Sequence, residues 1–202
     1  MDTLEAIKNR RSIRSQKSDK IDDATLNKVL EAARWAPSWA NTQAWRFIVV
    51  RDQNIKAQLA ATRAMRPPPP PAPGAAAPAT PPPAPPPPAI LTAPVTIVVC
   101  GELNKSGMRP DGTATTDKGG SWYMYDSGLA SQNLCLAAHA LGLGTVILGA
   151  FDAKKAGEIL NVPEGFAVVV MIPLGVPAAE GRPTTRKELA DIVGYDKFGG
   201  SK

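Results

Sequence analysis

A proline-rich tract divides the chain and restricts what it can fold into. Residues 67–88 contain 14 prolines in 22 positions, and the others are alanine, one glycine and one threonine. Proline has no N–H to donate and a fixed φ, so this tract can form neither a helix nor a central strand. As polyproline II it would reach roughly 70 Å, whereas a compact domain of this length has a radius of gyration of ~16 Å. We therefore expect one domain over residues 1–202, interrupted by a tract that protrudes or folds back loosely.

Three interpretations of this tract remain open. It is a disordered linker or surface loop, a ligand that offers repeated Pro-x-x-Pro to a proline-recognising domain, or an engineered or frame-shifted replacement. The last interpretation is prompted by the rest of the chain, which holds only seven prolines.

The remainder of the chain alternates helical and strand patterns, which predicts an α/β or α+β protein. Apolar spacing, acidic caps and the position of Pro37 predict helices at about residues 2–9, 22–36, 52–65, 119–141 and 152–160. Short β-branched runs predict strands at residues 47–50, 95–100, 145–148 and 167–172. The 119–141 segment is long, mostly apolar and free of proline, so we expect it to be a central helix buried on more than one side.

Composition favours an ordinary globular protein. Hydrophobic residues make up 44% and charged residues 20% of the chain. The longest apolar runs are about half of the ~18 residues that a membrane span requires, and no basic-then-apolar leader is present, so we expect a cytoplasmic protein without a membrane partner. Cys100 and Cys135 lie among apolar neighbours, which favours buried, inert thiols over a disulfide or a metal site.

The net charge of +5 is concentrated near the start of the chain, where Arg10-Arg11-Ser12-Ile13-Arg14 follows a predicted helix. Guanidinium groups bind phosphate through paired charge-assisted hydrogen bonds, and Ser12 adds a hydroxyl. Alternatively, these cations merely complement the helix dipole. A nucleic-acid site is the least favoured interpretation, because the region offers little aromatic or helical support.

Three further segments suggest a ligand. Ser38, Asn41 and Gln43 lie between two tryptophans, where they could bind the edge of a flat heteroaromatic ring or simply form a polar loop. Gly149 ends a predicted strand and would let a ligand approach the backbone. Thr185 to Glu188 resembles a capping box, which predicts a last helix with Arg186 in its first turn, where a bound phosphate would suit the dipole.

Catalytic side chains are not evident. His139 lies in an apolar helical segment without an acid, serine or cysteine partner at motif spacing, which favours a packed, structural histidine. Neither paired carboxylates nor a metal-ligand cluster are recognisable. This pattern points to chemistry carried by a cofactor.

Taken together, the ordered segments resemble the FMN-dependent nitroreductase family. They are Arg-Arg-Ser-Ile-Arg, then Pro-Ser-Trp-Ala-Asn-Thr-Gln-x-Trp-x-Phe, then the helix and Leu-Gly segment through residue 144, and the late Arg-Lys pair. The resemblance covers most of the chain but not the proline-rich tract. Ala44 stands where the family commonly has proline.

The resemblance implies an α+β fold, a three-layer sandwich with a mixed central sheet, and a homodimer built largely on the long helix. It implies one FMN at each subunit interface, reduced by NADH or NADPH and reoxidised by a nitroaromatic compound, a quinone or a similar acceptor. By position, Arg10, Ser12 and Arg186 would hold the phosphate, Arg14 would lie near the pyrimidine end of the ring, and Arg11 would belong to the same site. Ser38, Asn41 and Gln43 would come from the partner chain, with Leu148 and Gly149 near the reactive ring nitrogen. The alternative is a proline-rich interaction protein on this scaffold with weak or no flavin binding.

Overall fold

One sheet forms the centre of the molecule. The computed structural model describes residues 1–63 and 87–201. Four strands lie in the order β1 (Trp45–Val50), β2 (Val95–Glu102), β4 (Phe166–Gly175) and β3 (Gly144–Thr145). Each neighbouring pair is antiparallel. The expected mixed sheet is corrected in this respect: within residues 1–63 and 87–201, parallel pairing is limited to a single bridge between Ser12 and Thr145. The N-terminal segment contributes one bridging residue there and not a strand.

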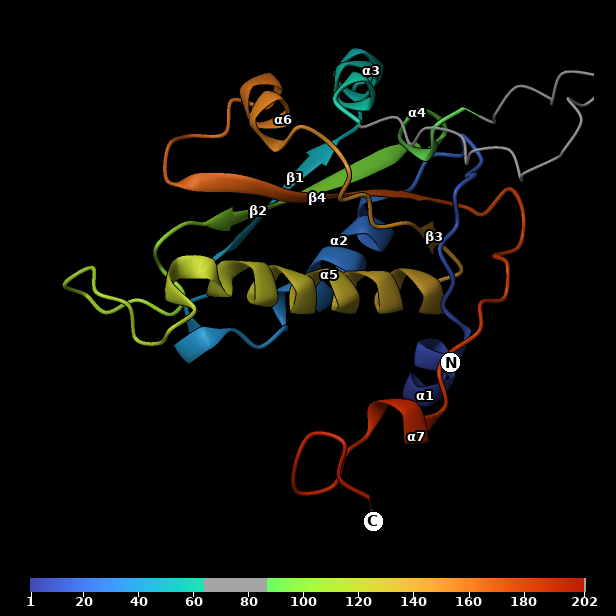
Figure 1. The fold of residues 1–202 in the computed structure, drawn as a ribbon. Helices are drawn as coiled ribbons and strands as arrows, with labels where there is room; N and C mark the ends of the chain where they lie inside the picture. Colours follow the sequence, from blue (N-terminus) through green and yellow to red (C-terminus); the bar gives the residue numbers. More distant parts are fainter. Residues whose placement is uncertain (64–86, 202) are drawn as a thin grey trace, which may run out of the picture.

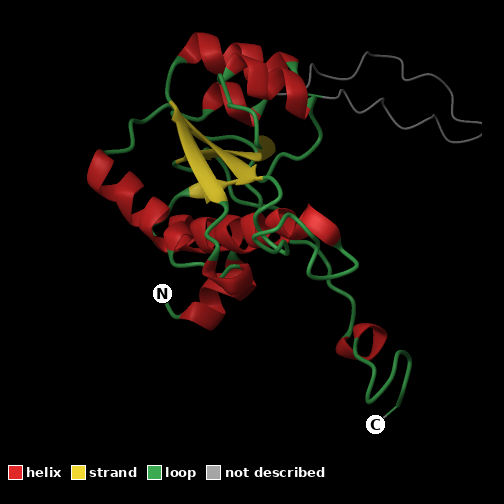
Figure 2. Cartoon of the chain, turned by 90° about the vertical axis from the view of Figure 1, so that its left-hand side faces the viewer, coloured by secondary structure: helices red, strands yellow, loops and turns green. Residues whose placement is uncertain are grey.

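Helices cover both faces of the sheet, which confirms the predicted three-layer α+β fold (Figures 1 and 2). On one face lie α3 (Gln53–Ala61), α4 (Ala89–Thr92) and α6 (Ala153–Ile159); on the other lie α2 (Asp23–Arg34) and the long α5 (Trp122–Ala140). A short 3₁₀ turn, Gly119–Ser121, leads into α5. The expected central helix is thus confirmed, and its first three residues form this turn.

The alternation of side chains along β2 explains why hydrophobic clusters form on both faces of the sheet. Successive side chains of a strand point to opposite faces, and β2 is buried from Val95 to Gly101. Val95, Ile97 and Val99 join a cluster with α2 and α5, whereas Val98 and Cys100 join a second cluster with α3, α4 and α6. Burying each such aliphatic side chain stabilises the fold by about 1.5–3 kcal/mol. The proline-free apolar run is therefore the central strand.

The ends of several helices follow local chemistry. The carboxylates of Asp22, Asp52 and Asp152 each accept a hydrogen bond from a backbone N–H three residues later, at the starts of α2, α3 and α6. Two expected elements are shorter than predicted. The helix expected to reach residue 65 ends at Ala61, and the strand expected at 145–148 is reduced to Gly144–Thr145, with Leu148 joined to Met171 by an isolated bridge.

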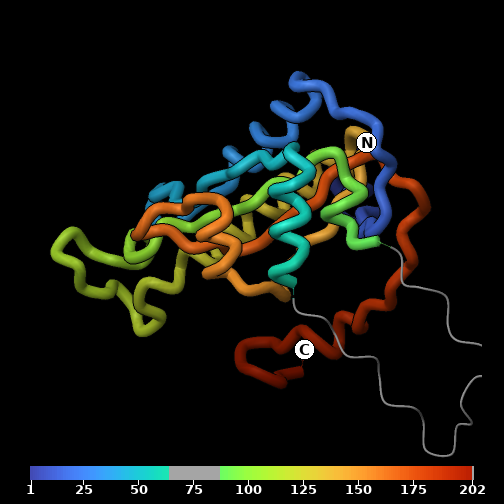
Figure 3. Tube along the Cα trace, turned by 90° about the horizontal axis from the view of Figure 1, so that it is seen from above, coloured from blue at the N-terminus to red at the C-terminus, as the bar shows by residue number. Residues whose placement is uncertain are grey.

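The last helix begins later than the sequence suggested. We expected it to start at Thr185, but α7 spans Leu189–Ile192, and its capping box is formed by Glu188 and Asp191. Arg186 therefore precedes this helix and does not lie in its first turn. Residues 182–199 are all exposed, so no apolar face is buried to extend a helix here. We call residues 182–199 the C-terminal arm, which leads away from the body of the molecule (Figures 2 and 3).

The proline-rich tract lies almost wholly outside the described residues. Of its prolines, only the last two belong to the described part, and Pro88 directly precedes α4. The expectations for the rest of the tract stay predictions.

Candidate functional site

The N-terminal basic segment lies along the β3 edge of the sheet. Ile13 N donates to Thr145 O at 2.8 Å, and Lys17 N donates to Val176 O at 2.8 Å. On the same side, the N–H of Ala178 donates to Ser15 O at 3.0 Å. The segment after α1 (Thr3–Asn9) is thus fixed by backbone bonds, and residues 10–14 have a defined position.

Three glycines allow this close approach. A Cβ on Gly144 would lie 2.8 Å from Ile13, one on Gly175 would lie 2.9 Å from the Gln16 side chain, and one on Gly181 would lie 2.3 Å from Arg11. Contacts shorter than 3.0 Å cannot be accommodated without movement of the neighbour. The absence of side chains at these positions therefore brings the basic segment against the sheet edge and the residue 181 region.

Two open cavities flank the basic segment. The larger, of about 610 Å³, is lined by cationic and polar groups that include Arg10, Arg11, Lys17, His139 and Glu180; we call it the α1–α5 cavity. The smaller, of about 480 Å³, is lined by Ser12, Arg14, Glu180, Gly181 and Arg182, among others. The family resemblance implies that Arg10 and Ser12 hold one phosphate, whereas the structure places them on the walls of two adjoining cavities.

The arginines of this region differ in what they contact. Arg11 Nη1 donates to Lys8 O at 2.6 Å and to Arg10 O at 3.0 Å, so Arg11 binds the carbonyl end of α1, as the helix-dipole interpretation expected. Arg186 lines neither cavity. It is exposed on the C-terminal arm, where Nη1 donates to Thr184 Oγ1 at 2.6 Å.

His139, on the last turn of α5, belongs to the wall of the α1–α5 cavity. Its Nε2 is shielded from solvent and has no hydrogen-bond partner among the described residues. Burial first, and then the charges of Arg10 and Arg11, hold the pKa of His139 below its ordinary value. The sequence interpretation of His139 as a packed, structural histidine stays a prediction.

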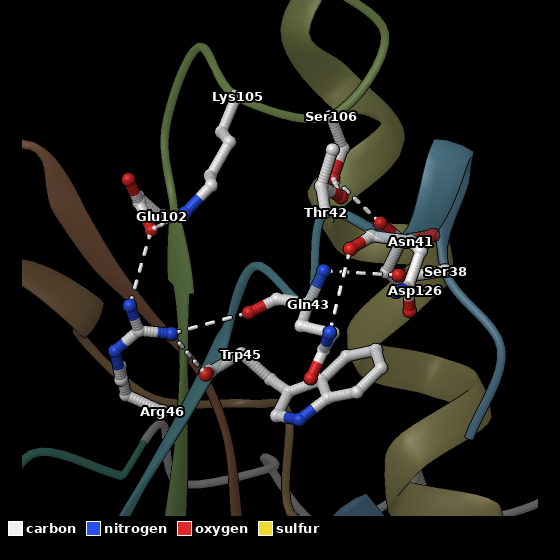
Figure 4. Close-up of polar contacts among 10 residues, drawn as sticks. All are labelled: Ser38, Asn41, Thr42, Gln43, Trp45, Arg46, Glu102, Lys105, Ser106 and Asp126. Carbon is white, nitrogen blue, oxygen red and sulfur yellow. Dashed lines mark hydrogen bonds and ion pairs between the residues drawn. The ribbon is translucent and has the colours of Figure 1, made fainter. Parts of the chain in front are cut away.

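The polar loop, residues 38–43, holds several of the polar side chains drawn in Figure 4, and its backbone is unusual. Ala40, Asn41 and Gln43 have φ values of 42°, 56° and 49°. Left-handed conformations are disfavoured for residues other than glycine and are tolerated best by asparagine. Gln43 N donates to Ser38 Oγ at 2.9 Å, which closes the loop. Backbone strain of this kind is concentrated at functional sites. Asn41 and Gln43 are both exposed.

A buried carboxylate anchors this loop (Figure 4). Asp126, in α5, is only 1% exposed. Its Oδ1 accepts from Trp39 N at 3.0 Å, and its Oδ2 accepts from Ser106 Oγ at 2.6 Å. Ser106 and Thr42 are in turn joined at 2.7 Å through their hydroxyls. Sequence reasoning missed Asp126, although it is the single acidic residue of the 119–141 segment and so had an available signal.

The two groups of expected site residues lie at opposite ends of α5. Asp126, which holds the polar loop, and His139, which lines the α1–α5 cavity, are 13 residues apart on this helix. At ~1.5 Å per residue the separation is roughly 20 Å. Within one chain, therefore, Ser38, Asn41 and Gln43 do not meet Arg10.

Leu148 and Gly149 follow β3 but differ in their surroundings. Leu148 is half-buried, and its N–H donates to Met171 O at 2.9 Å. Gly149 is exposed, and a side chain placed there would meet nothing within 4 Å. The backbone of Gly149 is therefore open to a ligand.

The general class of this protein is an α+β sandwich with a basic cavity at the edge of its sheet. Comparison with known proteins then identifies the family: the model of the nitroreductase family matches residues 7–176, and the chain belongs to that family. It is 32% identical over 190 residues to a Methanothermobacter thermautotrophicus protein assigned provisionally as an NADH dehydrogenase/NAD(P)H nitroreductase, covering 92% of this chain and 82% of that protein.

Two further relatives agree. An NADH dehydrogenase of Thermus thermophilus is 30% identical over 197 residues, with 96% of this chain and 95% of that protein covered. The crystal structure of a nitroreductase family protein from Clostridium novyi NT superimposes with a TM-score of 0.68 at 27% identity, covering 100% of this chain and 97% of that one. Family membership supports an NAD(P)H-dependent oxidoreductase. Among the residues that the structure describes, no helix is long and apolar enough to cross a membrane.

Proposed function

We propose that this chain is an FMN-dependent NAD(P)H oxidoreductase that reduces nitroaromatics, quinones or similar acceptors in two successive half-reactions. The observation that carries the proposal is the α1–α5 cavity, where Arg10, Arg11 and Lys17 face a single carboxylate, that of Glu180. Such an excess of cations suits a phosphate group. The names of the relatives add the nicotinamide donor.

The residues present fit the phosphate end of FMN. Arg10 contributes a guanidinium to the wall of the α1–α5 cavity, and Ser12 supplies a hydroxyl from the adjoining cavity. FMN, when bound, would accept a hydride from NADH or NADPH and pass the electrons to the acceptor. Arg10 and Ser12 would hold the phosphate, and Arg14 would place a fixed positive charge near the pyrimidine end of the ring, where negative charge develops on reduction.

The remaining ring contacts require a second copy of the chain. Ser38, Asn41 and Gln43 are held roughly 20 Å from the basic cavity by the length of α5, so in this proposal they reach the flavin of the partner subunit. Gly149 would offer backbone approach to the ring from the first subunit, with Leu148 beside it.

Exposed apolar side chains support this homodimer. Large apolar side chains are exposed on α1, α5 and the C-terminal arm, and they include Leu4, Ile7, Met124, Tyr125, Leu189, Ile192 and Phe198. In this proposal these side chains are covered by the partner subunit, because contiguous exposed apolar surface is typical of interaction sites. Arg186 lies on the same C-terminal arm. In this proposal Arg186 would reach a phosphate site when the arm packs against the partner subunit.

The decisive experiment is an anaerobic titration of FMN-loaded protein with NADH and with NADPH, followed by additions of nitro compounds and quinones. We expect bleaching of the flavin absorbance by a nicotinamide and its recovery on addition of an acceptor. Protein that stays colourless after incubation with FMN, and gains no thermal stability from it, contradicts the proposal. A strictly monomeric species in sedimentation of the FMN-loaded protein contradicts the two-chain site.

A further inference from the structure

Arg46, the second residue of β1, bonds back to the polar loop that precedes this strand (Figure 4). Its Nη1 donates to Gln43 O at 3.1 Å and to Trp45 O at 2.8 Å. Gln43 has a left-handed φ of 49°, and its own N–H donates to Ser38 Oγ inside the loop. Arg46 therefore fixes, from outside the loop, the carbonyl of a residue whose backbone conformation is disfavoured.

The guanidinium of Arg46 is in turn held by residues of the neighbouring strands. Arg46 pairs with Cys100 of β2, so it lies diagonally opposite Glu102 on the same face of the sheet. Arg46 Nη2 donates to Glu102 Oε2 at 3.4 Å, and Arg46 Cζ lies 5.5 Å from the centre of the Phe166 ring of β4. Arginine suits this position, because its planar fork can bind a carboxylate and a carbonyl at once and can lie against an aromatic ring.

Glu102 connects the end of β2 to the same loop by a second route. Its backbone N–H donates to Ala44 O at 2.7 Å, so the carbonyls of Gln43 and Ala44 are both held from the side of β2. Lys105 Nζ donates to Glu102 Oε2 at 2.8 Å. Glu102 therefore keeps a cationic partner when Arg46 is replaced, and the loss falls on the carbonyl of Gln43.

We propose that Arg46 is a positioning residue: it holds the carbonyl of Gln43 so that the side-chain amide of Gln43 is presented to the flavin of the partner subunit. The inference rests on the proposed function in so far as Gln43 reaches that flavin. Gln43 is exposed, and the hydrogen bond of its amide to a described residue is a long one, 3.5 Å to Asn41 O. This amide is therefore available to a ligand, and Arg46 acts through it without touching the flavin.

The first measurement follows the loop itself in protein without flavin. Amide hydrogen exchange is read by mass spectrometry on a peptide that spans residues 38–45. Exchange should be about three- to tenfold faster in Arg46→Met than in the wild type. Arg46→Lys keeps the charge but lacks the planar fork, so it should restore part of the protection.

The matched control is Arg51→Met. The side chain of Arg51 is 49% exposed, against 54% for Arg46, and it forms an ion pair with Asp23. It makes no printed contact with the loop, so this variant should keep the wild-type exchange of residues 38–45. Urea midpoints of all variants show that they are folded.

The second measurement asks whether Arg46 acts through Gln43. FMN dissociation constants are determined by flavin fluorescence for the wild type, Arg46→Met, Gln43→Ala and the double variant, at one protein concentration. Arg46→Met should weaken FMN binding about three- to tenfold in the wild-type background. In the Gln43→Ala background it should do so by less than about twofold, because the group being positioned is gone. A residue that merely stabilises the fold would give the same factor in both backgrounds.

The outcomes separate this inference from the proposed function. Unchanged exchange of residues 38–45 in Arg46→Met overturns the inference, whether or not FMN binds. Faster exchange with equal factors in the two Gln43 backgrounds shows that Arg46 holds the loop without positioning the amide, which also overturns it. If the wild type binds no FMN while exchange is faster in Arg46→Met, the flavin function falls, and the positioning of the loop by Arg46 stands.

Discussion

Replacing Asp126 by alanine should destabilise the protein strongly, because its carboxylate joins three segments. It accepts from Trp39 N at 3.0 Å and from Ser106 Oγ at 2.6 Å, and the side chain is 1% exposed. Hydrogen bonds to a charged group contribute about 1.5–3 kcal/mol each. Ser106 keeps its bond to Thr42, so we expect a loss of about 3–5 kcal/mol in the free energy of unfolding.

The assay is urea unfolding followed by tryptophan fluorescence at one fixed protein concentration, since a dimer's stability depends on concentration. With a slope of about 1–3 kcal/mol/M, the midpoint should fall by roughly 2 M. Asp126→Asn retains one acceptor oxygen and should lose about half as much. The matched control is Asp117→Ala, which makes the same change of charge at an exposed pair with Lys118 and should cost under about 1 kcal/mol.

We expect the same substitution to have a second effect, on the polar loop. Ala40, Asn41 and Gln43 hold disfavoured backbone conformations that cost about 1–3 kcal/mol each and need support from their surroundings. Without the Asp126 anchor the loop should relax, and FMN affinity should fall in folded protein. If Asp126→Ala loses no more stability than Asp117→Ala, the carboxylate does not hold the loop, and the assignment of its two bonds is wrong.

Other perturbations test the remaining parts of the site. Gly144→Ala places a methyl group 2.8 Å from Ile13 of the N-terminal segment and should destabilise the protein by about 1–3 kcal/mol. Gly157→Ala, whose methyl group would meet nothing nearer than 3.8 Å, should instead stabilise α6 by about 0.5–1 kcal/mol. If the urea midpoints of the two variants shift alike, the packing argument is contradicted. Arg10→Ala should weaken FMN binding about 10- to 100-fold, whereas Arg14→Ala should mainly lower the flavin reduction potential, and equal effects on affinity and potential refute this division. Burial raises the pKa of Cys100 from 9.0 to about 11, so its neutral thiol favours the folded state below pH 9, and this stability is lost as pH rises toward 11. The wild type should therefore lose more stability over this range than Cys100→Ala, and parallel pH profiles contradict the assignment.

The sequence predicted secondary structure correctly where the residues that determine an element lie within that element. The apolar β-branched run at residues 95–100 became the central strand β2, and the proline-free 119–141 segment became α5 with its preceding turn. The cap expected at Asp22 or Asp23 formed at Asp22, whereas Asp2 precedes α1 without a side-chain cap hydrogen bond. Each feature that was predicted correctly depends on side chains within a few residues of one another, so no knowledge of distant contacts was needed.

The last helix illustrates the limit of such reasoning. Thr185 and Glu188 form a plausible capping box, but Glu188 and Asp191 form another three residues later, and the structure uses the second. A local pattern ranks neither above the other. Which of the two boxes starts the helix depends on how much of each turn is buried by tertiary packing. The C-terminal arm is exposed, so too little apolar surface is buried to lengthen the helix.

The sequence by itself determined the elements, the family resemblance and the residue types suited to a phosphate. Only the tertiary structure decided which of these residues share a cavity. It brought His139 beside Arg10, joined Asp126 to the polar loop, and separated that loop from the basic segment by the length of α5. Contacts between residues far apart in the sequence, such as Trp39 and Asp126, depend on how helices and glycine-lined strand edges pack. This packing is a property of the whole chain and not of any segment in it.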